Sequence, residues 1–283
     1  EFGGNVATVG YIGSRGQRNG MNPDVNVGLP GAGAVQPRRR YASTLPNLTT
    51  LNYYGSTWET YYDAHQATFH RRLSGGLSFN TYYRLANAEW TDWVPWDGLV
   101  AEREAAARDM RHMWGGEVNY MLPWGESLTG LAPGLPAGWQ INAVASIQSG
   151  EPFDITNAAA RANTGLNDRP NMVGDPELPS DQQTVQPWFN TDAFVAQAVN
   201  TLGDAPPSPL HGPLTKQMAL SFYKDLNVTG AVRVQLRYEL YNVWNVANFI
   251  NPVATFGTSD FGSINSTGNF QPQQMQFAVK LIF

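Results

Sequence analysis

Few residues in this sequence have the type and spacing that a reactive site requires. The histidines are His65, His70, His112 and His211. His65 and His70 fall in one predicted strand, where a spacing of five residues places them on opposite faces. No His-x-His or Glu-x-x-His pattern occurs, so the sequence predicts no metal site. His112 lies where a strand is expected to begin, and we expect it to form a hydrogen bond at the rim.

Motifs of known catalytic chemistry are also missing. The sequence has no G-x-S-x-G nucleophile elbow, phosphate-binding loop or Rossmann glycine pattern. Glu151 and Asp154 flank the end of a predicted strand, as the paired carboxylates of a glycosidase can. Because such pairs arise often by chance in β proteins with few charges, we assign them no catalytic role. We therefore expect no enzyme activity and no cofactor.

Polar and apolar side chains alternate near the C-terminus. Arg233, Gln235, Arg237 and Glu239 fall on one face of a predicted strand, and Val234, Leu236, Tyr238 and Leu240 on the other. A charge at the middle of a bilayer costs about 2–4 kcal/mol, so the polar face of a membrane strand must face an interior lumen. Arg84 and Glu117 are candidates for the same lumen. Two interpretations stay open: these groups pair with neighbouring strands or a plug, or they contact a substrate.

The loops contain aromatic and acidic side chains. Trp90, Trp93 and Trp96 lie at the outer end of a predicted strand, at 77–93. They fit the aromatic girdle at a membrane interface, or a stacking platform for a sugar-like or aromatic ligand. The acidic residues Asp168, Asp175, Glu177 and Asp181 share one long loop, where they could hold Ca²⁺ weakly.

The strand pattern that must position these groups is clearest in the last nine residues. Met275, Phe277, Val279, Leu281 and Phe283 share one face, and Gln276, Ala278, Lys280 and Ile282 share the other. A soluble domain rarely ends on an exposed apolar strand, because such an edge recruits other chains. A membrane β-barrel can end in this way, since its apolar face meets lipid and its last strand is paired.

Composition limits the class of protein. Charged residues make up 14% of the 283 residues, below the roughly 25% of soluble domains. The net charge is -5, so no basic field favours nucleic acid. Cysteine is absent, which excludes disulfides and thiolate chemistry. No apolar run is long enough for a transmembrane helix. Because the sequence starts at Glu1 without a signal peptide, we expect either a processed chain or an internal piece of a longer one.

An all-β, antiparallel fold is predicted. Its strands are expected at 5–13, 58–73, 77–93, 108–122, 138–149, 216–228, 232–247 and 273–283, with one or two helical turns in 101–109. The connections alternate between two classes: short ones at 74–76, 122–137 and Gly230, and long ones at 14–57, 94–107, 153–215 and 249–272. Short turns on one side and long loops on the other are typical of outer-membrane barrels, where the short turns are periplasmic and the long loops extracellular.

Several segments resemble the C-terminal barrel of TonB-dependent receptors, in particular the Oar-like subgroup. They include 8–16 (TVGYIGSRG), 29–39 (LPGAGAVQPRR), 73–79 (LSGGLSF), 109–112 (DMRH), 120–125 (YMLPWG), 138–153 (GWQINAVASIQSGEPF), 167–176 (NDRPNMVGDP), 188–194 (WFNTDAF), 237–249 (RYELYNVWNVANF), 254–267 (ATFGTSDFGSINST) and 276–283 (QFAVKLIF). The resemblance follows nearly the whole chain in order.

The resemblance implies a transmembrane β-barrel in the outer membrane of a Gram-negative bacterium. Residues 1–283 would be roughly the last eight strands of a barrel of about 22 strands, without the plug and the N-terminal regulatory-like domain. The implied function is substrate uptake or export energised through TonB, which would contact the missing N-terminal region. Implied partners are the bilayer, lipopolysaccharide and the barrel-assembly machinery, which would read Phe277, Val279, Leu281 and Phe283. No substrate can be named, and no nucleic acid is expected.

Two other functions remain open from the sequence. Eight strands can close by themselves into a small outer-membrane barrel with a passive or structural role. A soluble β-sandwich that binds carbohydrate is the third alternative. The first two differ in whether the first and last strands pair with each other, because a membrane sheet cannot leave an edge open in lipid.

Overall fold

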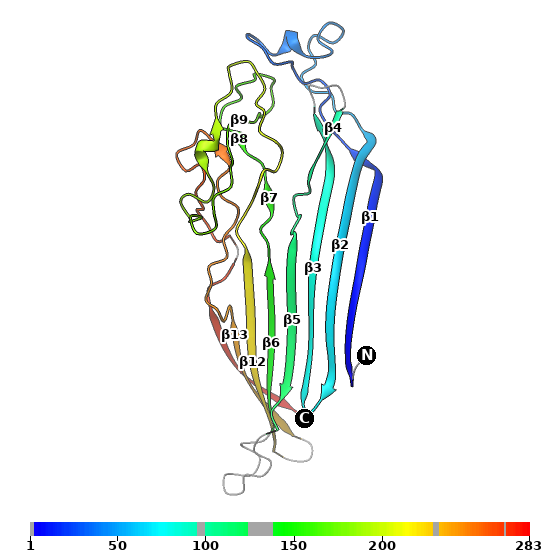
Figure 1. Cartoon of the computed structure of the whole chain (residues 1–283), viewed down its shortest axis with the longest axis vertical. Helices are drawn as coiled ribbons and strands as arrows, with labels where there is room; N and C mark the ends of the chain where they lie inside the picture. The colour runs from blue at the N-terminus through cyan, green and yellow to red at the C-terminus, as the bar shows by residue number, and fades with distance from the viewer. Residues whose placement is uncertain (1–2, 95–99, 124–137, 229–231, 269) are drawn as a thin grey trace.

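The computed structural model describes residues 3–94, 100–123, 138–228, 232–268 and 270–283. Its main element is one antiparallel nine-stranded sheet, in the order β1-β2-β3-β5-β6-β12-β13-β15, with β4 paired to β3 (Figure 1). The strands are β1 (Asn5–Met21), β2 (Gly55–Ser74), β3 (Leu77–Val94), β4 (Val100–Ala105), β5 (His112–Met121), β6 (Trp139–Gln148), β12 (Thr215–Asn227), β13 (Arg233–Tyr241) and β15 (Gln274–Ile282).

Shorter elements lie within the long loops. They are β7 (Pro152–Phe153), β8 (Thr156–Asn157), β9 (Asn171–Met172), β10 (Phe194–Val195), β11 (Leu210–His211) and β14 (Thr255–Phe256), with the 3₁₀ turns η1 (Gln36–Arg38) and η2 (Thr191–Ala193). Within the described residues, no helix is long or apolar enough to cross a membrane. The prediction of an all-β, antiparallel fold is confirmed.

Several elements differ from the predictions; β5, for example, begins at His112 and not at 108. β1 continues to Met21 and β2 begins at Gly55, so the predicted loop 14–57 is shorter. The expected helical turns in 101–109 are wrong: β4 pairs antiparallel with β3, from Glu89↔Ala105 to Val94↔Val100. Hydrogen bonding to the outer half of β3 thus overrides the helix propensity of Ala and Glu. β13 ends at Tyr241 instead of 247, where Asn242 and Asn245 adopt φ values of 49° and 48° and turn the chain.

Cross-strand pairing assigns every strand residue to one of two faces. The apolar face carries Val9, Phe79, Val118, Phe222, Leu236 and Phe277; the polar face carries Gln66, Arg84, Glu117, Asn142, Ser221 and Arg237. Phe277 is 79% exposed on the apolar face. That face is therefore not covered by a second sheet, as it would be in a β-sandwich.

Several cations depart from this division, among them Arg71, which pairs with Phe79, and Lys224. Lys224 lies on the apolar face, opposite Leu236 on β13 and Trp139 on β6. Its side chain is buried, with Nζ 5.9 Å from the centre of the Trp139 ring. Because Lys224 lies near the short-turn end of β12, its stem can follow the apolar surface while its charge reaches the interface.

The two ends of the sheet have different connections, as predicted. At one end β2 turns directly into β3 through Gly75 and Gly76, whose φ values of 59° and 80° favour glycine. Gly76 also accepts a backbone hydrogen bond from Met121 of β5 at 2.8 Å. The predicted turn at Gly230 and most of 122–137 lie outside the described residues. The long loops all extend from the opposite end (Figure 1).

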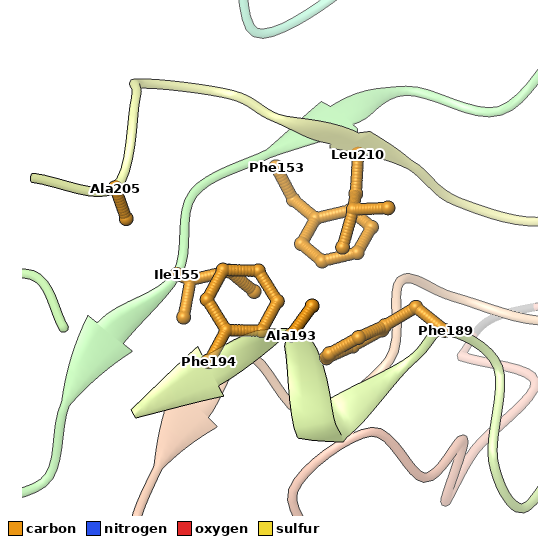
Figure 2. Close-up of a cluster of buried hydrophobic side chains, with 7 residues drawn as sticks. All are labelled: Phe153, Ile155, Phe189, Ala193, Phe194, Ala205 and Leu210. Carbon is orange, nitrogen blue, oxygen red and sulfur yellow. The ribbon is translucent and has the colours of Figure 1, made fainter. Parts of the chain in front are cut away.

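The long loops between β6 and β12 and between β13 and β15 form a folded cap with its own apolar core. Phe153, Ile155, Phe189, Ala193, Phe194, Ala205 and Leu210 are buried together (Figure 2), and Phe256 and Phe261 pack against them. Phe189 makes edge-to-face contacts with Phe194 and Phe261, at centroid distances of 6.0 and 5.1 Å. Gly150 and Gly212 bring the two ends of the β6–β12 loop together, since a Cβ on Gly150 would lie 1.9 Å from the Gly212 carbonyl oxygen.

A second long loop, between β1 and β2, is bound to this cap. Gly28 and Gly31 donate backbone hydrogen bonds to the carbonyls of Thr164 and Ala162. The Asn163 side chain donates to the carbonyls of Gly31 and Gly33, both at 2.8 Å. Two loops that leave the sheet at well-separated strands are therefore joined above it.

Candidate functional site: the polar face, the aromatic rim and the outer polar cluster

The predicted polar residues of β13 form one connected chain with β12. Arg233 lies 3.5 Å from Asp225, and Asp225 accepts a hydrogen bond from Gln235 at 2.9 Å. Arg237 donates to Gln235 at 2.6 Å, and its guanidinium carbon lies 5.1 Å from the Tyr223 ring centre. Tyr223 and Tyr241 both donate to the Glu239 carboxylate, at 3.2 and 3.1 Å. The charges of β13 on this face are thus paired with neighbouring groups of β12 and β13.

Arg84 and Glu117 lie on the same polar face but away from this chain. Arg84 is on β3, opposite Gln66 and Met113. Glu117 is on β5, opposite Asn80 and Val144. β6 and β12 separate them from β13. The predicted polar residues are therefore spread along a wide wall and do not converge on one point.

Trp90 is the one predicted tryptophan of this region whose side chain lies within the described residues. Trp90 donates its indole N–H to Glu104 at 2.6 Å and contacts Trp58 edge-to-face at 5.2 Å. Trp58, which the sequence analysis did not single out, lines a cavity of about 710 Å³ together with Met21, Pro23 and Tyr54. Trp96 lies outside the described residues, as does the Trp93 side chain. Trp90 lies on the polar face, because it is six residues from Arg84 along β3, so it does not belong to an outward-facing aromatic girdle.

The acidic residues of the long loop do not form a calcium site. Asp168 is buried and accepts hydrogen bonds from the Asn157 side chain at 2.6 Å and from the Ala162 backbone N–H. Asp175 is exposed and accepts the Glu177 N–H at 3.0 Å. Across the described ranges, no group of three or more acidic, His or Cys residues could hold a metal ion. These side chains organise the backbone of the cap.

The histidines also have local partners. His112 begins β5, and its Nδ1 atom lies 2.6 Å from the hydroxyl oxygen of Tyr83. The ring of His65 contacts Tyr11 at a centroid distance of 5.4 Å. His65 faces the apolar side and His70 the polar side, because His65 pairs with Leu85 and His70 with Asn80.

The C-terminal strand presents its apolar residues outward. Phe277, Val279 and Leu281 are exposed, and Phe283 follows the last residue of β15 with 95% of its surface exposed. Phe277 stacks on Tyr238 of β13 at a centroid distance of 4.6 Å. Among the residues that the structure describes, this terminal apolar strand pairs with β13 alone.

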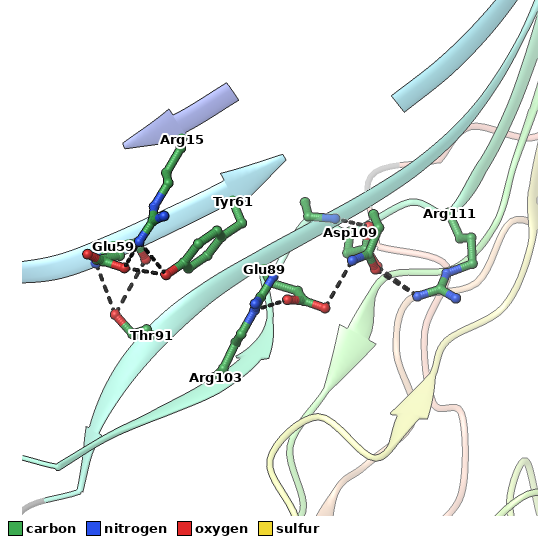
Figure 3. Close-up of polar contacts among 10 residues, drawn as sticks. Arg15, Glu59, Tyr61, Glu89, Thr91, Arg103, Asp109 and Arg111 are labelled. Atoms are coloured by element: carbon green, nitrogen blue, oxygen red, sulfur yellow. Dashed lines mark hydrogen bonds and ion pairs between the residues drawn. The ribbon is translucent and has the colours of Figure 1, made fainter. Parts of the chain in front are cut away.

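An additional polar group lies at the loop end of the apolar face. We call it the outer polar cluster: Arg15, Glu59, Tyr61, Glu89 and Arg103 (Figure 3). Arg15 pairs with Glu59 at 2.9 Å, and Glu59 also accepts the Tyr61 hydroxyl. Arg103 pairs with Glu89. The sequence analysis missed this cluster because its members come from four different strands.

The two arginines contact one aromatic ring. The guanidinium carbon of Arg15 lies 4.9 Å from the centre of the Tyr61 ring, and that of Arg103 lies 4.0 Å from it. Both arginine side chains remain 53% exposed. Cations near an aromatic face are attracted by its quadrupole, so the ring holds both groups in place.

This arrangement has the character of a membrane wall: one apolar face, one paired polar face and a folded cap at one end. A family model described as an outer membrane beta barrel domain matches residues 1–276. A comparison with curated proteins gave no match. The chain therefore belongs to the outer membrane beta barrel domain family, and its location is the bacterial outer membrane.

Proposed function

We propose that this chain forms part of the wall of a larger barrel of the TonB-dependent receptor type. Its polar face lines the interior, and the receptor moves a substrate across the outer membrane with energy supplied through TonB. The resemblance of the segments from 8–16 to 276–283 supports the receptor assignment, and the open edges of the sheet support the larger barrel.

The observation that carries the proposal is the open sheet. Among the described residues, β1 pairs only with β2, and β15 pairs only with β13. In lipid, an unpaired strand edge leaves N–H and C=O groups without partners, which costs several kcal/mol for each group. We infer that further strands complete both edges.

The polar face favours a wide interior. Arg237, Glu239 and Gln235 are long side chains that extend from one strand and pair along the wall. A small self-closed barrel fills its interior with packed side chains, whereas wide barrels enclose water or a plug. A paired polar wall can face water or a plug without leaving buried charges alone.

Disulfide trapping tests the open sheet. Residues 1–283 contain no cysteine, so a disulfide formed within them must join the two introduced cysteines. Gly10→Cys in β1 is combined in turn with Gln276→Cys, Ala278→Cys and Lys280→Cys in β15, and the protein is oxidised in its outer membrane. We expect no intramolecular disulfide, since bridged Cα atoms must lie within about 7 Å. A disulfide in any of these pairs would favour the self-closed barrel.

The control uses strands that are neighbours in the structure. Leu236 on β13 lies opposite Val279 on β15. Leu236→Cys with Val279→Cys should therefore form a disulfide under the same conditions. Energy coupling is tested separately by crosslinking in the intact host: the full-length protein should recover TonB. Failure to recover TonB would contradict the receptor assignment and leave the barrel itself unaffected.

A further inference from the structure

The outer polar cluster lies on the outward side of the sheet. Arg15, Tyr61 and Glu89 pair with one another across β1, β2 and β3. Each is six residues along its strand from a residue of the apolar face, namely Val9, Ala67 and Tyr83. Because strand side chains alternate with a period of two, an even spacing keeps the cluster on that same face. It therefore points away from the interior.

The height of the cluster matches the headgroup layer of the outer leaflet. Glu89 is twelve residues from Leu77, which begins β3 beside the short turn. At about 3.3 Å per residue and a tilt of about 40°, this spacing raises Glu89 roughly 30 Å above Leu77. The apolar band of such barrels is about 25 Å tall. The cluster thus begins just beyond the hydrocarbon.

Tyrosines on the apolar face, closer to the short turns than the cluster, indicate the same boundary between hydrocarbon and headgroups. Tyr11 and Tyr83 lie on the apolar face and direct their hydroxyls to Asp63 and His112. Amphipathic tyrosines of this kind are enriched where the hydrocarbon meets the headgroups. One row, Gly13, Asp63 and Asn87, separates the cluster from Tyr11 on this face, and the apolar residues follow below it. One lipid molecule is long enough to contact both the apolar residues and the cluster.

The arginines have donors to spare for an anion. Within the described residues, Arg15 uses its Nη2 atom for Glu59 and Tyr61, and Arg103 uses its Nε atom for Glu89. A guanidinium has five N–H donors in a planar fork that matches phosphate. The carboxylates and the shared Tyr61 ring fix both forks in position. Because the two arginine side chains are already ordered, they lose less conformational entropy when an anion binds.

We propose that the outer polar cluster binds the phosphorylated headgroup of an outer-leaflet glycolipid, with Arg15 and Arg103 as its phosphate ligands. This inference rests on the outer-membrane family and on the direction of the apolar face, and it does not depend on the transport proposal. Glu59 and Glu89 act as positioning residues for the two arginines.

Lipid retention tests the proposal. The full-length protein is purified from its own outer membrane in mild detergent, saturated with lipid A and passed through size-exclusion chromatography, and phosphate per protein is measured. Arg15→Gln with Arg103→Gln should retain at least roughly tenfold less lipid A, because two charge-assisted hydrogen-bonding groups are lost. Arg15→Lys with Arg103→Lys keeps the charges and should retain more lipid than the glutamine variant.

The matched control removes two arginines from the opposite face. Arg233→Gln with Arg237→Gln makes the same change of charge and should retain as much lipid A as the unmodified protein. Equal retention by the glutamine variant of the cluster would overturn the proposal, as would an equal loss in this control. An equal loss in the control would mean that overall charge, and not the cluster, governs lipid retention.

The unmodified protein provides a test that needs no variant. Chemically dephosphorylated lipid A has the same acyl chains but lacks the phosphates. It should be retained several-fold less than lipid A, and equal retention would overturn the role of phosphate. Inorganic phosphate should compete poorly, because it lacks the acyl chains that contact the apolar face. If millimolar inorganic phosphate displaces the lipid completely, the site is one for free phosphate and the lipid proposal fails.

Discussion

Arg38 donates a hydrogen bond through Nη2 to the backbone carbonyl of Asn163 at 2.7 Å, although 125 residues separate the two in sequence. The same guanidinium also donates to the carbonyl of Leu29 within its own loop. Arg38 thus holds the β1–β2 loop in shape and attaches it to the cap of the β6–β12 loop. With the Asn163 side chain, Arg38 thus links loops that leave the sheet at distant strands.

Replacing Arg38 should weaken this attachment without affecting the sheet, because the hydrogen bonds of Gly28, Gly31 and Asn163 remain. Arg38→Ala removes charge-assisted hydrogen bonds that typically contribute about 1.5–3 kcal/mol each. We expect faster protease cleavage within 22–52 on intact cells, with an unchanged amount of protein in the outer membrane. Arg40→Ala is the control, because Arg40 is exposed. Equal cleavage of the two variants would show that the link does not hold the loop.

The two faces of β13 should respond differently to a new charge. Leu236→Arg places a second cation on the apolar face, opposite Lys224, at a cost that rises from about 0–1 kcal/mol near the interface to about 2–4 kcal/mol at the bilayer midplane. Gln235→Arg places the same group on the polar face, where Asp225 lies within hydrogen-bond distance of Gln235. We expect a large loss of outer-membrane protein for Leu236→Arg and little for Gln235→Arg, by immunoblotting of membrane fractions. Similar levels would mean that the faces are assigned wrongly.

Removing the last residue should impair assembly. Phe283 is almost fully exposed at the end of β15 and makes few contacts that would stabilise the folded sheet. If the barrel-assembly machinery reads this terminal aromatic residue, deletion of Phe283 should lower the outer-membrane level of the full-length protein severalfold. Phe283→Tyr keeps an aromatic ring and should assemble better than the deletion. A normal level of the deleted protein would argue against such a signal.

Asp168 should be required for the order of the cap. Asp168→Asn keeps the size of the side chain but replaces one acceptor oxygen with a donor, facing the Asn157 amide or the Ala162 N–H. Leaving a buried donor unsatisfied costs about 1–3 kcal/mol. We expect faster amide hydrogen exchange across 153–211 and an unchanged rate in β12 and β13. Asp181→Asn, at an exposed position, is the control and should exchange like the unmodified protein.

Local patterns in the sequence were enough to predict the fold class and most of the strands. Alternation in 232–241 and 275–282 predicted two faces, and the pairing of Leu236 with Val279 places the apolar residues together. The division into short turns and long loops was also readable. These features are local: a period of two and a turn at Gly75–Gly76 depend on residues close in sequence.

Only the tertiary structure decided the features that join distant segments. β4 forms because β3 offers it a partner, against the helix propensity of its own residues. The cap core brings Phe153 to Phe189 and Phe261, which no periodic pattern connects. The outer polar cluster collects Arg15, Tyr61 and Arg103 from separate strands. Such contacts depend on cross-strand register and loop packing, which are set by long-range pairing and burial and not by the order of neighbouring residues.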